Sequence, residues 1–259
     1  MDSSAPLILV SNDDGVGAPG LRALAECLAP LGTVVVVAPD RERSAAGHSI
    51  TLNHPLRAHA VADGWHSVDG TPTDCVTLGV MQLLPRRPAL VAAGINHGGN
   101  MGDDITYSGT VACAVEATLH GIPAFAVSLA GEGAPDFRAA ASFAGRLAAE
   151  ILRRGLPAYT FLNVNVPNGP PENVRGHQVT RQGRRTYVDT VTRKEDPRGR
   201  PYYWIGGSAP TWERSSGTDS EAVFGGFISL TPLRLDFTDH GTMEDLRTWP
   251  LGNHADLPR

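Results

Sequence analysis

Several kinds of feature are scarce in this chain of 259 residues, and each shortage excludes a class of protein. No apolar run approaches the roughly 20 residues that a membrane-spanning helix needs. The formal net charge of −5 lacks the basic excess that is typical of nucleic-acid binders. Neither a GxGxxG motif nor a Walker A loop is present, so dinucleotide and ATP-type phosphate cradles are not indicated. We therefore expect no membrane and no stable nucleic-acid partner.

Cysteine is also scarce. The chain has three cysteines, Cys27, Cys75 and Cys113, and none belongs to a CxxC pair. This pattern favours buried, reduced thiols in a cytoplasmic protein over a disulfide framework. The opening residues, MDSSAPLILVSNDD, lack the basic segment of a signal peptide and lead directly into an apolar run. The histidines show no paired ligand spacing, so a zinc site is not indicated.

The first two-thirds of the chain alternates short apolar runs with segments of helical periodicity. Continuous β-branched or apolar runs predict five buried core strands, at Leu7–Val10, Thr33–Ala38, Ala89–Ala93, Ala124–Leu129 and Thr160–Pro167. Runs of this kind suit a parallel sheet that is covered on both faces. The pattern predicts an α/β fold, with a Rossmann-like, doubly wound, mostly parallel sheet and helices on both faces.

The composition changes after about Arg175, where Arg, Gly, Pro and aromatic residues replace the helical pattern. We expect residues 1–175 to form the Rossmann-like core. Residues 176–259 would add a β-hairpin arm around Tyr202–Ile205, a returning strand at Phe227–Leu230 and a C-terminal segment with a short helix at Met243–Trp249. The whole is interpreted as one structural domain with an extension that serves oligomerisation.

Polar residues follow three of the predicted core strands. Asp13 and Asp14 follow the first strand, Ser44 follows the second, and Asn96 follows the third. In a doubly wound fold the carboxyl ends of the strands form one rim, where ligands bind. Adjacent carboxylates at a strand end make sense if a cation lies between them, and oxygen-only ligands indicate Mg²⁺ or Mn²⁺. The alternative is that Asp13-Asp14-Gly15 forms an ordinary turn.

A second candidate site lies at the start of the segment YSGTVACAVEA. Ser108, Gly109 and Thr110 lead directly into a predicted helix, and a helix N-terminus offers unpaired N–H groups that suit phosphate. Glycines upstream of this segment permit close backbone approach to a ligand. The alternative is an ordinary N-cap with no ligand.

Taken together, several blocks of the sequence resemble one family. The blocks ILVSNDDGVGAPGLRALAECL, VAPDRERSAAGHSITL, GTPTDCVTLG, GINHGGNMGDDITYSGTVACAVEA, LNVNVP and GTDSEAVFGGFISLTPL occur in this order over nearly the whole chain. The chain closely resembles the survival protein E (SurE) family of 5'/3'-nucleotidases. The resemblance implies a divalent-metal phosphatase that acts on nucleoside monophosphates and, in some members, on polyphosphate. It also implies an oligomer, either a homodimer or a homotetramer, that exchanges C-terminal elements.

Carried over to this chain, the resemblance assigns individual residues. It implies one divalent cation per subunit, with ligands at Asp13, Asp14, Ser44 and Asn96. It places the phosphate-facing loop at Ser108, Gly109 and Thr110, with Asn100 nearby. The expected catalytic set is therefore Asp13, Asp14, Asn100 and Ser108. One departure is the segment AAGHS after Ser44, where the family often has a small residue and Asn, so that His48 alters the entrance to the site.

Two alternatives stay open at this stage. Attack by a cation-activated water and covalent attack by Asp13 are both chemically reasonable routes to phosphate release. The same pocket would also serve a non-catalytic sensor of nucleotide or phosphate. Release of inorganic phosphate from a nucleotide distinguishes the enzyme from the sensor.

Overall fold

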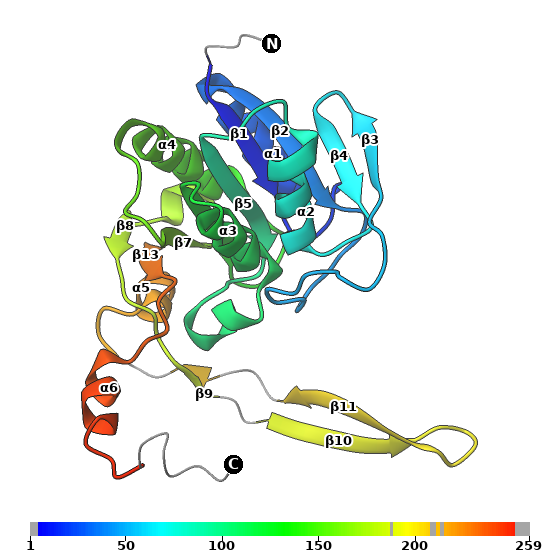
Figure 1. Ribbon diagram of the computed structural model, residues 1–259, viewed down its shortest axis with the longest axis vertical. Coiled ribbons are helices and arrows are strands. Elements are labelled where there is room, and N and C mark those ends of the chain that lie inside the picture. The colour runs from blue at the N-terminus through cyan, green and yellow to red at the C-terminus, as the bar shows by residue number, and fades with distance from the viewer. Residues whose placement is uncertain (1–4, 187–188, 208–210, 213–214, 252–259) are drawn as a thin grey trace.

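The computed structural model describes residues 5–186, 189–207, 211–212 and 215–251. Its centre is a nine-stranded sheet with the strand order β3-β4-β2-β1-β5-β6-β7-β13-β8 (Figure 1). The strands of this sheet are β1 Leu7–Ser11, β2 Thr33–Pro39, β3 Ala58–Ala62, β4 Trp65–Val68, β5 Leu90–His97, β6 Ala124–Ala130, β7 Thr160–Pro167, β8 His177–Val179 and β13 Ile228–Arg234. The six strands β4, β2, β1, β5, β6 and β7 are parallel, and β3, β13 and β8 run the other way.

Helices cover both faces of the sheet, as the alternation along β1 requires. Ile8 and Val10 pack on one face with helices α1 Pro19–Leu28 and α4 Arg138–Arg154. Leu7 and Leu9 pack on the other face with α2 Pro72–Leu78 and α3 Gly109–Leu119. The predicted α/β class and the mostly parallel, doubly wound sheet are confirmed.

Most predicted elements form close to where the sequence places them, and the differences have local causes. The C-terminal helix α6 spans His240–Leu246, earlier than the predicted 243–249, because the Asp239 side chain accepts a hydrogen bond from the Thr242 N–H and starts the helix there. Helix α5 Asp219–Phe224, capped by the Thr218 side chain, was not predicted, because its six residues are too few to show helical periodicity.

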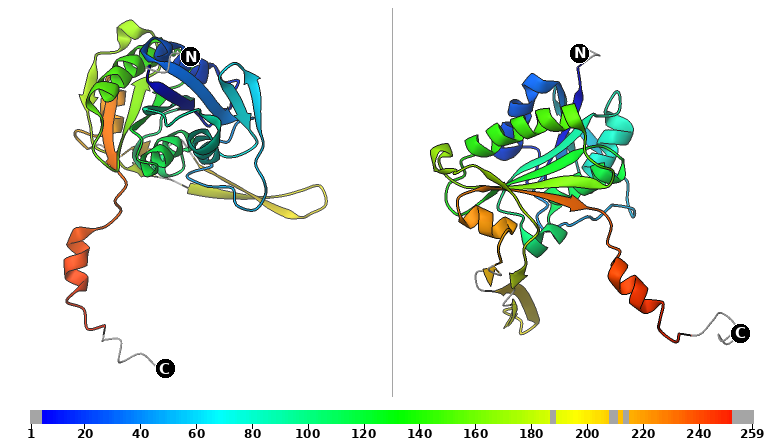
Figure 2. Two further views of the ribbon diagram at one scale, coloured as in Figure 1. Left: turned by 45° about the horizontal axis from the view of Figure 1, so that its top comes forward. Right: turned by 90° about the vertical axis from the view of Figure 1, so that its left-hand side faces the viewer.

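The C-terminal third of the chain adds strands to the sheet and also forms segments that project away from it (Figure 2). Strands β8 and β13 extend the sheet beyond β7, with Leu230 of β13 opposite Val164 of β7. The predicted hairpin forms from β10 Asp189–Glu195 and β11 Pro201–Gly207, and short strands β9 Arg185–Thr186 and β12 Thr211–Trp212 pair at its base. The hairpin and α6 project away from the sheet at separate places (Figure 2). No helix in these described ranges is long and apolar enough to cross a membrane.

Candidate active site

Three loops meet at the carboxyl edge of the sheet. The loop after β2 contacts the loop after β1 through the N–H of Arg43, which donates to the carbonyl oxygen of Asp13 at 2.8 Å. The same loop contacts the segment before α3, since the Gly47 N–H donates to the Tyr107 carbonyl at 3.0 Å. At the end of β5, the His97 N–H donates to the Asp14 carboxylate at 3.3 Å. The structure therefore brings together the strand ends from which a common site was predicted.

Asp13 is held against the N-terminus of α3. Its side chain is buried, and its carboxylate accepts hydrogen bonds from the Thr110 hydroxyl and from the backbone N–H groups of Gly109 and Thr110. A Cβ at position 109 would lie 2.7 Å from the Cβ of Asp13, so only glycine permits this approach. Burial raises the pKa of Asp13, and these hydrogen bonds oppose the rise. The predicted phosphate loop and the predicted metal ligand are thus in direct contact.

Asp14 lies beside Asp13 and is partly exposed. Burial, followed by the negative charges of Asp13 and Glu42, raises the pKa of Asp14 to about 6, although the His97 N–H lowers it. A divalent cation beside two adjacent carboxylates would relieve the repulsion between their negative charges. The raised pKa of Asp14 is the observation that supports a cation site at these two residues.

The two remaining predicted ligands, Ser44 and Asn96, are each next in the chain to a residue whose N–H contacts this pair, namely Arg43 and His97. Ser44 is exposed, and its hydroxyl donates to Glu42 at 2.7 Å. The side-chain nitrogen of Asn96 donates to the Gly98 carbonyl at 2.7 Å, which leaves the amide oxygen as the atom for a cation. Within the described ranges, no group of three or more His, Cys, Asp and Glu side chains is placed to hold a metal. The assignment of Ser44 and Asn96 as further ligands of a cation stays a prediction.

Ser108 is confirmed as the N-cap of α3. Its hydroxyl accepts a hydrogen bond from the Val111 N–H at 3.1 Å, and its side chain is buried. The cap does not exclude a phosphate contact, because a serine hydroxyl that accepts one hydrogen bond still has its own proton to donate. The role of Ser108, Gly109 and Thr110 in phosphate binding stays a prediction.

Asn100 lies in the loop between β5 and α3, and its side chain belongs to a buried polar layer. Its N–H donates to the Asn165 side chain and its side-chain nitrogen donates to the Ser128 hydroxyl, both at 2.8 Å. Its carbonyl oxygen accepts from the side chains of Asn163 and Asn165 at 2.8 and 3.0 Å. These partners were not predicted. The signal was present in LNVNVP, where two Asn residues two positions apart share one face of a buried strand.

A second buried carboxylate, that of Asp219, joins the rim to the base of the arm. It accepts hydrogen bonds from the Gly102 N–H at 2.8 Å and from the Gly183 N–H at 3.0 Å. The side chain of Gln182 also donates to the Gly102 carbonyl. The loop that carries the predicted phosphate site is therefore fixed to the start of the C-terminal extension.

A cavity of about 530 Å³ runs beside α3 and begins at Ser108. Its polar lining includes His48, Thr106 and Gln182, and its apolar lining includes Val115 and Phe161. The end of β13 and the residues directly after it, 233–237, also line the cavity. A molecule held at Ser108 by a phosphate would thus have room for a larger group beside it.

Comparison with known proteins agrees with this geometry. The family model described as Survival protein SurE matches residues 8–189. The chain is 58% identical over 245 residues to the 5'-nucleotidase SurE of Geobacter sulfurreducens, a match that covers 94% of each chain. It is 56% identical to the 5'-nucleotidase SurE of Pelobacter propionicus, with 93% of this chain and 98% of the relative covered. The crystal structure of the SurE protein from Aquifex aeolicus has a TM-score of 0.84 and 45% identity, and the match covers 93% of this chain and 98% of that one.

Proposed function

The chain belongs to the SurE family and is a nucleotidase, and we propose that it depends on a divalent cation and hydrolyses nucleoside 5'- and 3'-monophosphates to nucleoside and phosphate. Short polyphosphate is a further proposed substrate. The observation that carries the proposal is the Asp13–Asp14 pair at the carboxyl edge of the sheet, with the N-terminus of α3 directly behind it.

The proposed cation is Mg²⁺ or Mn²⁺, one per subunit, held by Asp13, Asp14, Ser44 and Asn96. When bound, it supplies charge neutralisation and a more acidic water. The chain's own residues orient the reaction: Thr110 and the N–H groups of Gly109 and Thr110 fix the Asp13 carboxylate. Ser108 would donate its hydroxyl proton to a phosphate oxygen. The layer around Asn100 would keep this loop in one conformation.

The contacts of Asp13 also bear on the choice of nucleophile. A carboxylate that already accepts hydrogen bonds from one hydroxyl and from backbone N–H groups is a weaker nucleophile than a free one. This supports attack by water over a covalent aspartyl route. Asp14, which is less buried than Asp13, is the better placed carboxylate to accept the proton of that water.

We further propose a homodimer or homotetramer in the cytoplasm, assembled through the C-terminal arm. Large apolar side chains of the extension are left in solvent, with Ile205 87% exposed and Phe237 95% exposed. Exchange of such an element between subunits is a low-cost route to an oligomer. The three cysteines are free thiols, which suits a reducing compartment.

The decisive experiment is phosphate release from a panel of nucleoside 5'- and 3'-monophosphates by protein stripped with a chelator. We expect no turnover without metal, recovery with Mn²⁺ or Mg²⁺, and a loss of at least about 100-fold in kcat/KM for Asp13→Asn. The asparagine keeps an acceptor for Thr110, so the variant should remain folded by circular dichroism. Full activity of metal-free protein would overturn the metal proposal, and nucleotide binding without phosphate release would indicate a sensor.

A further inference from the structure

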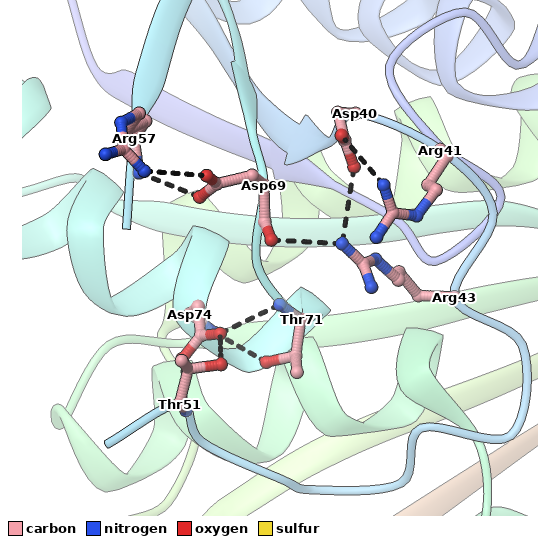
Figure 3. A network of polar contacts seen from close by, with 8 residues as sticks. All are labelled: Asp40, Arg41, Arg43, Thr51, Arg57, Asp69, Thr71 and Asp74. Carbon is pink, nitrogen blue, oxygen red and sulfur yellow. Dashed lines mark hydrogen bonds and ion pairs between the residues drawn. The ribbon is translucent and has the colours of Figure 1, made fainter. Parts of the chain in front are cut away.

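The loop that carries Ser44, residues 40–54, is long and mostly exposed, and it is anchored near both ends. Near its start, Arg43 donates to the Asp69 carbonyl at 3.0 Å and lies 3.4 Å from Asp40. Near its end, the Asp74 carboxylate accepts from the N–H and the hydroxyl of Thr51 at 2.9 and 2.6 Å. Figure 3 shows both anchors. Between these anchors the backbone is held at two points, since the Gly47 N–H donates to the Tyr107 carbonyl and the Thr71 hydroxyl donates to the Ser49 carbonyl at 2.7 Å. One side chain of the loop adds a further contact.

His48 supplies that contact. Its Nε2 donates to the Glu116 carboxylate of α3 at 2.9 Å. Among residues 44–50, all of which are described, no other side chain forms a hydrogen bond outside the loop: Ser44 bonds to Glu42 and Ser49 bonds to Ala46.

Glu116 is built to receive this contact. Its side chain is 12% exposed, and its carboxylate also accepts from the Thr77 hydroxyl of α2 at 2.8 Å. On its own helix, His120 lies 3.2 Å from the carboxylate without the alignment of a hydrogen bond. The hydrogen bond from His48 lowers the pKa of Glu116, so the carboxylate is ionised at neutral pH. A fixed, charged acceptor on a core helix is a firmer anchor than an exposed ion pair.

We propose that His48 and Glu116 form a tether that holds residues 44–48 of this loop against α3 and thereby positions Ser44 for the divalent cation. The two are positioning residues and do not themselves contact the cation or the substrate phosphate. The proposal rests on the proposed function in one respect, namely that Ser44 is a cation ligand. The mechanical part, that the tether orders the loop, stands on the geometry alone.

The test compares three variants. His48→Leu removes the hydrogen bond to Glu116 and keeps a side chain of similar reach. His48→Gln restores a donor. The matched control is His120→Leu, which removes the other imidazole beside the same carboxylate without touching the loop. Each protein is prepared free of metal.

Two measurements are made on each variant. Hydrogen exchange with mass spectrometry follows the peptide that contains the Gly47 N–H, which is bonded to Tyr107 and reports whether the loop is seated. Calorimetry gives the Kd for Mn²⁺ without nucleotide. For His48→Leu we expect exchange about 5- to 10-fold faster and Mn²⁺ binding weaker by about the same factor, the scale of one charge-assisted hydrogen bond. Most of the wild-type kcat should return at saturating Mn²⁺, while His120→Leu should match the wild type and His48→Gln should recover most of both signals.

The outcomes separate the tether from the proposed function. Equal exchange in His48→Leu and wild type would overturn the tether. Faster exchange with an unchanged Mn²⁺ Kd would overturn its role in positioning Ser44. If the wild type binds no Mn²⁺, the proposed function and the positioning of a cation ligand both fail, and the exchange data alone decide whether the tether orders the loop.

Discussion

The rim of the sheet and the C-terminal extension differ in the kind of side chain that each buries or exposes. At the rim, polar groups are buried and many of them find partners within the same fold, as Asn100 does with Ser128, Asn163 and Asn165. In the extension, apolar groups lie in solvent: Trp204 of the hairpin and Phe237 before α6 are both exposed. The polar groups of the rim are covered by the fold, whereas the exposed apolar side chains of the extension lack a surface to cover them.

Because of this difference, we expect the rim to depend on a bound ligand and the extension to depend on contact with another surface. An isolated two-stranded hairpin such as β10–β11 is marginally stable in water, because it has no third strand or helix to bury its apolar side chains. The rim has the sheet and four helices behind it. We therefore expect changes in the extension to alter assembly and changes at the rim to alter chemistry, and the predictions below test that division.

The largest expected effect is on assembly. Replacing Asp189–Gly207 by two glycines removes the hairpin at a point where its strands are paired, so the chain ends to be joined are close. We expect the mass in light scattering to fall by half or more, because the apolar side chains of the hairpin no longer reach a second subunit. The melting behaviour of the remaining core should change little.

A shorter deletion serves as the matched control for this prediction. Replacing Asp196–Arg200 by Asn-Gly removes the tip and keeps both strands, since Asn-Gly forms a two-residue hairpin turn. The mass of this variant should equal that of the wild type. An unchanged mass after removal of the full hairpin would show that assembly depends on another surface, and it would end the division between the two regions.

A smaller effect is expected at the cap of α3. Ser108→Ala removes the acceptor for the Val111 N–H and should lower the free energy of unfolding by about 1 kcal/mol. If the hydroxyl also donates to phosphate, inhibition by inorganic phosphate should weaken by about tenfold. Enzyme kinetics with phosphate as inhibitor and chemical denaturation measure the two quantities separately.

The extension supplies a control for this cap. Asp239→Ala removes the side chain that accepts from the Thr242 N–H at the start of α6, so it is also a cap loss. It should leave phosphate inhibition unchanged. Equal phosphate inhibition in Ser108→Ala and wild type would reduce Ser108 to a structural cap and leave phosphate to other groups of the rim.

The smallest expected effect is the dependence of stability on pH at Asp14. Its folded pKa of about 6 lies above the ordinary aspartate pKa of 3.8, so the folded metal-free protein holds this proton more tightly than the unfolded chain does. The corresponding stability is present below about pH 4 and is lost as the pH rises to about 6. Asp14→Asn lacks this loss, so its melting temperature should exceed that of metal-free wild type by about 2–4 °C at pH 7 and by less at pH 4.

Divalent metal should reverse that order. With Mn²⁺ present, the wild type should gain stability by mass action and Asp14→Asn should gain much less. Melting curves at pH 4, 5, 6 and 7, with chelator or with Mn²⁺, measure both effects. A variant that is equally stabilised by Mn²⁺ would mean that Asp14 is not a ligand.

The sheet and the meeting of the strand ends were predictable because they depend on hydrophobic periodicity and on the geometry of parallel strands. Buried runs such as Leu7–Val10 specify strands on their own. Once the strands are parallel, the residues that follow them must share one edge. The resemblance to the SurE family supplied the proposed ligands on that edge, and the structure brings Asp14 within reach of the end of β5.

What could not be predicted depends on contacts between residues far apart in the chain. Nothing local marks Asp219 as the acceptor for Gly102, because the two lie 117 residues apart. The same holds for His48 and Glu116, and for the N–H groups of α3 that turn towards Asp13. A pattern within one segment indicates which face of an element is buried. It does not indicate which polar group of a distant segment will form a hydrogen bond with that face.

The close approach of Gly109 to Asp13 has a consequence for reading natural variants of this chain. A Cβ at position 109 would lie 2.7 Å from the Cβ of Asp13 and 2.9 Å from the Pro72 ring, so even alanine must displace the aspartate or the helix start. A change of one methyl group would then behave as a null allele, although all four proposed ligand codons are intact. A survey that scores only those four positions would count such a gene as functional.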